Sequence, residues 1–199
     1  MKNIVCLLGS PRPDGNSAAI AGRFLDAAAK RGASVRTFML NELKYRGCQG
    51  CYVCKHHLDR CVLEDGLTQV LDAVRDADLL VLASPVYYGD ITSQLKGFID
   101  RSFSYLVPDY MTNPRPCRLA PGKKLVFVLT QGHPDESQYA DVFPRYNAFL
   151  TWYGFDGHHL IRSCGLSRQT DAEALDVAMK LAEETADLMF PEPKGSWRP

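Results

Sequence analysis

Four cysteines stand close together in the sequence, at a spacing that could bind metal. Cys48, Cys51, Cys54 and Cys61 follow the pattern Cys-x2-Cys-x2-Cys-x6-Cys. Two-residue spacers let successive thiolates reach neighbouring irons of one cubane, whereas a four-cysteine zinc site usually has two Cys-x2-Cys pairs separated by a longer stretch. The spacing therefore favours an iron-sulfur cluster. Zinc, a disulfide and a loop without metal remain the alternatives.

A polar loop with the properties of a phosphate site follows the first apolar run. It reads Gly-Ser-Pro-Arg-Pro-Asp-Gly-Asn-Ser over residues 9–17, and a segment of helical period follows it. A helix start offers free backbone N–H groups and partial positive charge, to which Ser10, Asn16 and Ser17 add short donors and Arg12 adds charge. Neither the lysine-containing nucleotide loop nor Gly-x-Gly-x-x-Gly is present, so a single phosphate fits best. The alternative is that these residues only cap the helix and form the turn.

A second loop contains two adjacent aromatic residues. The sequence Pro-Val-Tyr-Tyr-Gly-Asp over residues 85–90 follows an apolar run. Two aromatic rings beside a glycine, with backbone donors nearby, suit a planar heterocycle with polar edges. A flavin is such a ring.

Apolar runs of five or six residues alternate with longer segments of helical period, the pattern of a parallel sheet covered by helices. Strands are predicted over Asn3–Leu8, Ser34–Met39, Leu79–Ser84, Leu125–Thr130 and Gly157–Arg162. Their apolarity predicts burial on both faces. Helices are predicted over Ser17–Arg31, Gly66–Ala77, Gln94–Phe103, Asp135–Tyr153 with a break near Pro144, and Thr170–Phe190, the last beginning with a Thr170 and Glu173 capping box.

This alternation predicts an α/β fold: a flavodoxin-like, doubly wound, five-stranded parallel sheet of order 2-1-3-4-5, with helices on both faces. Ligands of such sheets bind at the carboxyl ends of strands 1 and 3. We expect one domain over residues 1–190, with a cysteine-rich insertion at 41–65, a Pro- and Arg-rich insertion at 106–123 and a tail at 191–199. The cysteine insertion follows strand 2, so the expectation is that it lies at the same sheet edge as the other two loops.

The composition argues against several classes of protein. Among 199 residues, 23 Lys plus Arg balance 23 Asp plus Glu, so no basic excess supports binding to nucleic acid or to an anionic membrane. The longest apolar runs are far shorter than the roughly 20 residues of a membrane-spanning helix. The first residues do not resemble a secretory signal, which favours a cytoplasmic protein in which thiols stay reduced.

Three motifs in this order resemble those of the NADPH-dependent FMN reductase superfamily. They are Gly-Ser-Pro-Arg-x-x-Gly-Asn-Ser from residue 9, Ser-Pro-Val-Tyr-Tyr-Gly from residue 84, and Gln-Leu-Lys-Gly-Phe-Ile-Asp-Arg from residue 94. The cysteine loop resembles specifically that of the iron-sulfur flavoproteins within this superfamily. The resemblance covers about residues 1–165.

The resemblance implies FMN as cofactor. It places the phosphate against Ser10, Arg12, Asn16 and Ser17, and the flavin ring against Pro85, Val86, Tyr87, Tyr88 and Gly89. It places Gln131 and Gly132, which follow the fourth strand, on the other side of the ring. It also implies a [4Fe-4S] cluster on Cys48, Cys51, Cys54 and Cys61.

The predicted function is electron transfer between a reduced donor, NAD(P)H or a ferredoxin-like protein, and an acceptor, with the flavin carrying the chemistry. A cluster-free NAD(P)H-dependent FMN or quinone reductase, a non-enzymatic flavodoxin-like carrier and a zinc-stabilised interaction module are the alternatives. The expected partner is a small molecule or a redox protein. The resemblance implies a homodimer or homotetramer, for which the aromatic, Arg-rich residues 105–118 have the composition of an interface.

Overall fold

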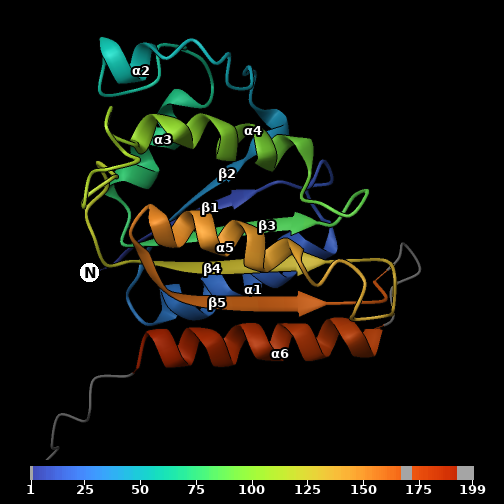
Figure 1. Ribbon diagram of the computed structural model, residues 1–199. Helices are drawn as coiled ribbons and strands as arrows, with labels where there is room; N and C mark the ends of the chain where they lie inside the picture. The colour runs from blue at the N-terminus through green and yellow to red at the C-terminus, as the bar shows by residue number, and fades with distance from the viewer. Residues whose placement is uncertain (1, 167–171, 192–199) are drawn as a thin grey trace, which may run out of the picture.

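The computed structural model describes residues 2–166 and 172–191, and Figure 1 shows their arrangement. The strands are β1 (Asn3–Leu8), β2 (Ser34–Met39), β3 (Leu79–Pro85), β4 (Lys123–Thr130) and β5 (Phe155–Ser163). The α-helices are α1 (Asn16–Lys30), α2 (Val53–His56), α3 (Thr68–Asp76), α4 (Ser93–Arg101), α5 (Val142–Trp152) and α6 (Ala172–Met189). Two 3-10 helices are η1 (Leu40–Glu42) and η2 (Ser102–Tyr105).

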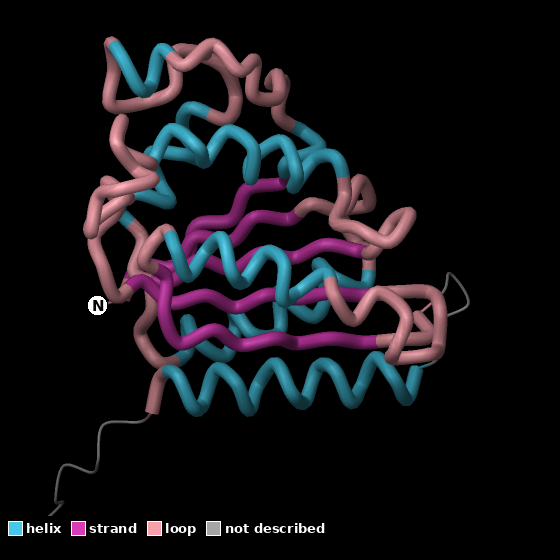
Figure 2. Tube along the Cα trace, viewed as in Figure 1, coloured by secondary structure: helices cyan, strands magenta, loops and turns pink. Residues whose placement is uncertain are grey.

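The five strands form one parallel sheet of order β2-β1-β3-β4-β5. Helices α3, α4 and α5 cover one face of the sheet, and α1 and α6 cover the other (Figures 1 and 2). This confirms the predicted doubly wound fold and strand order. The carboxyl ends of β1 and β3 lie beside each other, as a ligand site at this edge requires.

Two apolar clusters, one on each face, account for the packing. Alternate residues of a strand point to opposite faces, so Leu80 and Leu82 join the cluster under α3, α4 and α5, while Leu79 and Val81 join the cluster over α1 and α6. Cys6 is fully buried in the second cluster, where burial raises its pKa to about 12. This cysteine is therefore a core residue, as its place in an apolar run predicts.

The prediction that all five strands are buried on both faces is wrong for the two outer strands. Every residue of β3 is buried, but in β2 only Phe38 is buried, and in β5 only Phe155, Ile161 and Ser163 are buried. Side chains point to the two faces of the sheet, and at its two edges the helical layers cover these faces only in part, so polar side chains there remain in contact with water.

The predicted helix over residues 135–153 begins later and is not broken at Pro144. Helix α5 starts at Val142, and Tyr139 before it has a φ of 61°, which ends any helical run. Pro144 falls in the first turn, where its missing N–H removes no helical hydrogen bond. Thr170 of the predicted capping box lies outside the described residues, as does the tail from residue 192.

Helix α2, which the sequence analysis did not anticipate, interrupts the cysteine-rich insertion. None of the helices in the described parts of the chain is long and apolar enough to cross a membrane.

Candidate functional site

The loop between β1 and α1 leaves the start of α1 free for an anion. Gly15 is the N-cap and has no side chain to bond the first turn, while its carbonyl accepts from the N–H groups of Ala18 and Ala19. The side chain of Ser10 folds back to accept a hydrogen bond of 3.1 Å from the N–H of Arg12. The earliest N–H groups of α1 therefore keep the positive end of the helix dipole available.

Close packing against α4 fixes the start of this loop. The hydroxyl of Thr92, the N-cap of α4, donates to the Gly9 carbonyl at 2.8 Å. A Cβ on Gly9 would lie 2.8 Å from Thr92 Oγ1 and 2.9 Å from Leu95 Cβ. Only glycine allows this approach without displacement of α4.

The loop after β3 forms a tight turn. Tyr87 and Asp90 exchange backbone hydrogen bonds of 2.8 and 3.1 Å, and Tyr88 and Gly89 between them have φ values of 50° and 77°. Two successive positive φ angles are those of a type I′ turn, for which glycine is favoured. The side chain of Tyr88 points into solvent, and Tyr87 is 43% exposed.

Helix α5 anchors this turn through Asp90. Tyr146 donates its hydroxyl to Asp90 Oδ1 at 2.7 Å, and Arg145 approaches Asp90 Oδ2 at 3.4 Å. Burial, together with the hydrogen bond to the carboxylate, holds the pKa of Tyr146 well above its ordinary value of 10. Tyr146 therefore stays protonated and donates at all physiological pH values.

The loop after β4 is built around Gln131. Its buried side chain donates to the carbonyls of His133 (2.9 Å) and Asp135 (3.0 Å), and its amide oxygen accepts from Arg162 at 2.7 Å. All these contacts stay within the protein, so the Gln131 side chain shapes the loop. His133 is exposed, and its Nδ1 accepts from the Asp135 N–H.

These three loops enclose a cleft of about 160 Å³ at the carboxyl edge of the sheet. Eight of the eleven residues predicted to bind the flavin line it: Ser10, Arg12, Asn16, Ser17, Pro85, Val86, Tyr87 and Gly132. Tyr88, Gly89 and Gln131 are not part of the lining. Thr130, the last residue of β4, and Leu166 complete it. Leu166 was not predicted. Its place just after the fifth strand could have indicated it, because the carboxyl ends of parallel strands meet at the same edge.

The residues of the cleft fit a phosphorylated flavin. Arg12 Nε is buried and has no hydrogen-bond partner in the described structure. Such a group is costly unless an anion or water satisfies it, and it lies beside the free start of α1. The opposite wall, Pro85 to Tyr87, is apolar and aromatic, as a planar ring requires.

The four cysteines of the insertion border a second, small cavity of about 30 Å³. Cys48 and Cys51 are exposed, Cys54 is buried and Cys61 is partly buried. Left-handed backbone at Gly50 (φ 60°) and Tyr52 (φ 56°) turns the chain sharply between them. Four thiols around one cavity are a donor set that suits iron or zinc. As they stand, the described residues contain no group of three or more His, Cys, Asp or Glu side chains placed to hold a metal ion.

The expectation that the cysteine loop lies at the flavin edge of the sheet is wrong. Helix α4 starts at that edge and runs back, and the loop is bonded to the far end of α4, where Arg101 donates to the carbonyls of Arg46 and Leu63. The two cavities share no lining residue. Figure 1 shows α2 beyond α3 and α4, away from the carboxyl ends of the strands. The buried Arg101 and its Asp65 partner, at 2.9 Å, determine this path.

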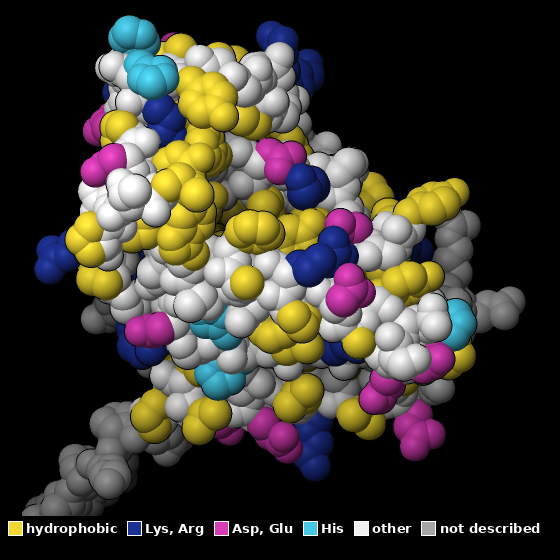
Figure 3. Space-filling model, viewed as in Figure 1, with side chains coloured by type: hydrophobic (Ala, Val, Ile, Leu, Met, Phe, Trp, Pro, Cys, Tyr) yellow, Lys and Arg dark blue, Asp and Glu magenta, His cyan; other side chains and the backbone are white. Residues whose placement is uncertain are grey.

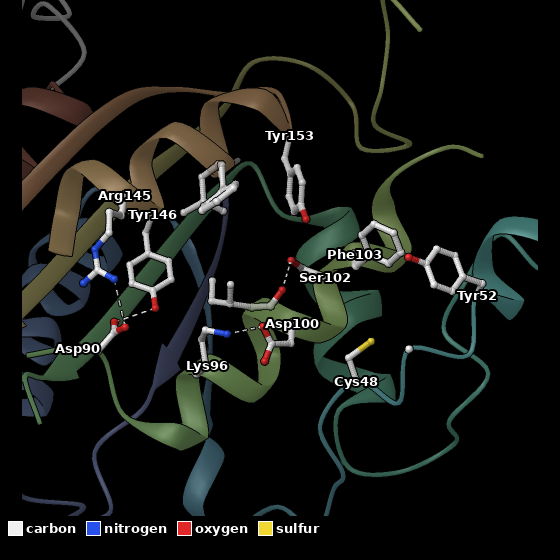
Figure 4. Close-up of a pocket in the computed structure, with 14 residues that line it drawn as sticks. Cys48, Tyr52, Asp90, Lys96, Asp100, Ser102, Phe103, Arg145, Tyr146 and Tyr153 are labelled. Carbon is white, nitrogen blue, oxygen red and sulfur yellow. Dashed lines mark hydrogen bonds and ion pairs between the residues drawn. The ribbon is translucent and has the colours of Figure 1, made fainter. Parts of the chain in front are cut away.

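A groove of about 640 Å³ extends between α4, α5 and the cysteine loop (Figure 4). Asp90 of the ring loop lines one end and Cys48 lines the other. The walls between them include Ile99, Phe149 and Tyr153. In Figure 3, hydrophobic side chains gather around this hollow. The groove therefore links the ring loop to the cysteine loop along the outer face of the molecule.

The fold is that of a flavodoxin-like α/β protein, with a cleft at the carboxyl edge of the sheet. The chain belongs to the NADPH-dependent FMN reductase family, whose sequence pattern matches residues 2–140. This confirms the family inferred from the loop motifs.

Curated relatives carry two kinds of name. An iron-sulfur flavoprotein of Archaeoglobus fulgidus is 39% identical over 105 residues, which are 51% of this chain and 46% of that protein. An iron-sulfur flavoprotein of Methanocaldococcus jannaschii is 34% identical over 99 residues, which are 50% of this chain and 51% of that protein. An FMN-dependent NADH:quinone oxidoreductase of Sinorhizobium fredii is 32% identical over 120 residues (55% of each). The chain spans about half the length of the curated relatives it matches.

Solved structures of low sequence identity share the fold. An FMN-dependent NADH-azoreductase of Bacillus anthracis, in complex with FMN, matches with a TM-score of 0.74 at 15% identity, over 96% of this chain and 100% of that chain. An NAD(P)H:quinone oxidoreductase of Methanothermobacter marburgensis matches with a TM-score of 0.74 at 16% identity, over 94% and 97%.

Proposed function

We propose that this chain binds FMN in the cleft and acts as an oxidoreductase that transfers electrons between a reduced donor, NAD(P)H or a ferredoxin-like protein, and an acceptor. The observation that carries the proposal is the cleft itself, where Arg12, whose buried Nε has no partner in the described structure, and the free start of α1 line the same cavity as Pro85, Val86 and Tyr87. FMN, when bound, supplies chemistry that accepts electrons in pairs and releases them singly.

In this proposal the residues of the first loop hold the phosphate. Arg12 contributes charge, and the side chains of Ser10, Asn16 and Ser17 together with the start of α1 contribute donors. Ser10 and Ser17 are almost fully buried, at 3% and 2% exposed, so their hydroxyls meet the ligand with little competition from water.

The ring loop orients the planar part of the ligand. Pro85, Val86 and Tyr87 provide one wall of the cleft, and Gly132 provides the opposite side. The N–H of Val86 donates to the Thr130 carbonyl at 2.7 Å, which holds the two walls at a fixed separation. No protein acid, base or nucleophile is assigned, because the cofactor carries the chemistry.

For the cysteine loop we propose a [4Fe-4S] cluster on Cys48, Cys51, Cys54 and Cys61. Their spacing, their common cavity and the name iron-sulfur flavoprotein of the relatives support it. Such a cluster carries single electrons. The described residues hold no preformed group of three metal-ligating side chains, so in this proposal the four thiols move together when the metal binds.

The separation of the two sites supports an oligomer. From Ser93 to Phe103, the chain of α4 and η2 spans about 15 Å at the usual helical rise, and it lies between cleft and cysteines. We propose that the cysteine loop of one subunit approaches the flavin cleft of another, with the apolar groove over α4 and α5 covered between them. Light scattering of the protein at micromolar concentration tests this, and a monomer would reject it.

The test of the cofactor assignment begins with protein purified without oxygen. The visible spectrum, the identity of the released flavin, and iron and sulfide content are measured on one sample. The proposal expects one FMN and about four irons per chain. FMN without iron, even after reconstitution with iron and sulfide, would leave a cluster-free reductase. A protein that neither contains nor binds flavin would reject the function.

The remaining alternatives separate in turnover assays. An oxidoreductase consumes NAD(P)H, or accepts electrons from ferredoxin, with a quinone or free flavin as acceptor. A flavodoxin-like carrier exchanges single electrons rapidly but shows no steady turnover of NAD(P)H. For the cluster, Cys51→Ser should lose most of the iron, whereas Cys164→Ser, outside the cysteine loop, should retain it.

A further inference from the structure

Lys55 lies buried beside a proposed cluster ligand. It is 5% exposed, and its ammonium group donates to the carbonyls of Phe103 at 2.6 Å and Leu106 at 2.7 Å. The same Nζ lies 3.6 Å from Cys54 Sγ and 4.1 Å from the centroid of the Phe103 ring. Hydrogen bonds to two carbonyls, a contact with the Cys54 sulfur and a contact with the Phe103 ring therefore hold the Lys55 ammonium group in place.

A second cation converges on the same point from the Pro- and Arg-rich insertion. Arg118 Nη1 donates to the Ser104 carbonyl at 2.9 Å and also to the Leu106 carbonyl, the oxygen that Lys55 uses. Arg118 Nη2 donates to the Cys54 carbonyl at 3.2 Å. Two positive charges thus share one carbonyl oxygen and both touch Cys54.

This arrangement lacks a balancing carboxylate. Among residues 2–166 and 172–191, no Asp or Glu forms an ion pair with Lys55 or Arg118. Like charges held together in a partly buried site repel each other, and they cost free energy unless an anion offsets them. Cys54, one of the four proposed cluster ligands, contacts both cations, with its sulfur near Lys55 Nζ and its backbone carbonyl accepting from Arg118, so a negatively charged centre bound there would offset them.

We infer that Lys55 and Arg118 form a cationic pair that stabilises the negative charge of a metal centre bound by the cysteine loop, and so raises its reduction potential. The inference rests on the proposed cluster. A cluster with four thiolate ligands is negatively charged and becomes more so on reduction, so nearby fixed positive charge favours the reduced form. Both side chains act through charge and hydrogen bonding and neither is a ligand.

Arg101 is a third cation at this cavity, but its charge is balanced by Asp65. Its side chain is fully buried and lines the cavity of the four cysteines, and its Nε has no partner in the described structure. Its other nitrogens bind Asp65 and two carbonyls. Because it also determines the path of the loop, Arg101 is a poor choice for the test.

The test is a redox titration of the holoprotein followed by electron paramagnetic resonance, comparing Lys55→Met and Arg118→Met with Lys55→Arg and Arg118→Lys. Each Met variant should lower the midpoint potential of the cluster by at least 59 mV, which is a tenfold change in a one-electron equilibrium. Each charge-conserving variant should recover most of the shift. Lys180→Met, an exposed residue of α6, is the matched control and should leave the potential unchanged.

FMN content and far-ultraviolet circular dichroism of each variant show whether the fold is intact. Where a Met variant does not fold, the midpoint potential of the neutral Lys55→Gln variant is compared with those of the charge-conserving Lys55→Arg and Arg118→Lys variants. If the parent protein contains the cluster, and the folded Met and Gln variants have the same midpoint potential as the parent, this inference is overturned while the cluster assignment stands. A parent protein that binds FMN but no cluster after reconstitution would overturn it together with the cluster assignment, and a parent without flavin would reject the proposed function.

Discussion

Tyr146 donates a hydrogen bond of 2.7 Å to Asp90 and thereby joins α5 to the turn that borders the cleft proposed to bind FMN. Asp90 Oδ1 also accepts from the N–H of Ile91 at 2.7 Å, so one carboxylate holds both the turn and the helix. Tyr87, three residues earlier, carries the wall of the cleft. The position of this wall therefore depends on a contact outside the cleft.

Replacing Tyr146 with Phe should weaken FMN binding without removing a contact to the ligand. We expect a loss of about 1.5–3 kcal/mol in the free energy of unfolding, typical of one hydrogen bond to a charged group, and a several-fold increase in the dissociation constant of FMN. Quenching of flavin fluorescence and urea unfolding measure the two effects. Thr151→Ala, which removes a hydroxyl bonded within α5 alone, is the control. Unchanged affinity for FMN would show that the turn holds its position without α5.

Replacing Arg12 with Ala should discriminate between two forms of the flavin. The loss of a charge-assisted contact to phosphate costs about 1.5–3 kcal/mol, so FMN should bind at least tenfold more weakly. Riboflavin, which lacks the phosphate, should bind Arg12→Ala and the parent protein equally. Arg23→Ala removes an exposed arginine of α1, paired with Glu183, and should change neither affinity. Equal losses for FMN and riboflavin would contradict a phosphate role.

Two glycine-to-alanine substitutions should change the stability of the protein in opposite directions. A methyl group on Gly9 would meet Thr92 and Leu95 at less than 3.0 Å, so Gly9→Ala should lower stability by about 1–3 kcal/mol and weaken FMN binding. A methyl group on Gly22, in the middle of α1, meets no atom within 4 Å. Gly22→Ala should raise stability by about 0.5–1 kcal/mol, because alanine favours a helix. Calorimetry compares the two variants, and a stable Gly9→Ala protein with normal FMN binding would contradict the packing argument.

The sequence predicted the sheet well because its signal is local. Apolar runs such as Leu79–Ser84 are separated by segments of helical period, and the order of the strands follows from that alternation. The three loops of the cleft could be located in the same way, since the carboxyl ends of parallel strands must meet at one edge. Which side chains enter the cleft was less predictable. Tyr88 and Tyr87 are adjacent and alike in sequence, but the left-handed turn sends Tyr88 into solvent.

The position of the cysteine loop could not be predicted, because it depends on contacts between residues far apart in the chain. The loop follows β2, whose end lies at the flavin edge, but Arg101 at the other end of α4 bonds to Arg46 and Leu63 and draws it back. The importance of Lys55 and Arg118 is likewise invisible in sequence, since 62 intervening residues separate two side chains that share one carbonyl. Long-range pairing of this kind has no periodic signature.

The ion pair of Asp65 with Arg101 predicts a pH dependence of stability. Burial disfavours the charged form of Asp65, but hydrogen bonds from Arg101 and from the N–H groups of Arg46 and Leu67 outweigh it and hold the pKa below the ordinary 3.8. The native protein therefore binds fewer protons than the unfolded chain between these two pKa values. Stability from this group is complete above about pH 4 and is lost as the pH falls through the native pKa.

Asp65→Asn should accordingly lower the free energy of unfolding at about pH 7 by about 1–3 kcal/mol, and the difference from the parent protein should shrink below about pH 4. Urea unfolding at several pH values measures it. Asp156→Asn, which removes an exposed partner of Lys124, should show a much smaller effect. A constant difference down to about pH 3 would mean that Asp65 stabilises the cysteine loop through its shape and backbone hydrogen bonds, with no contribution from its charge.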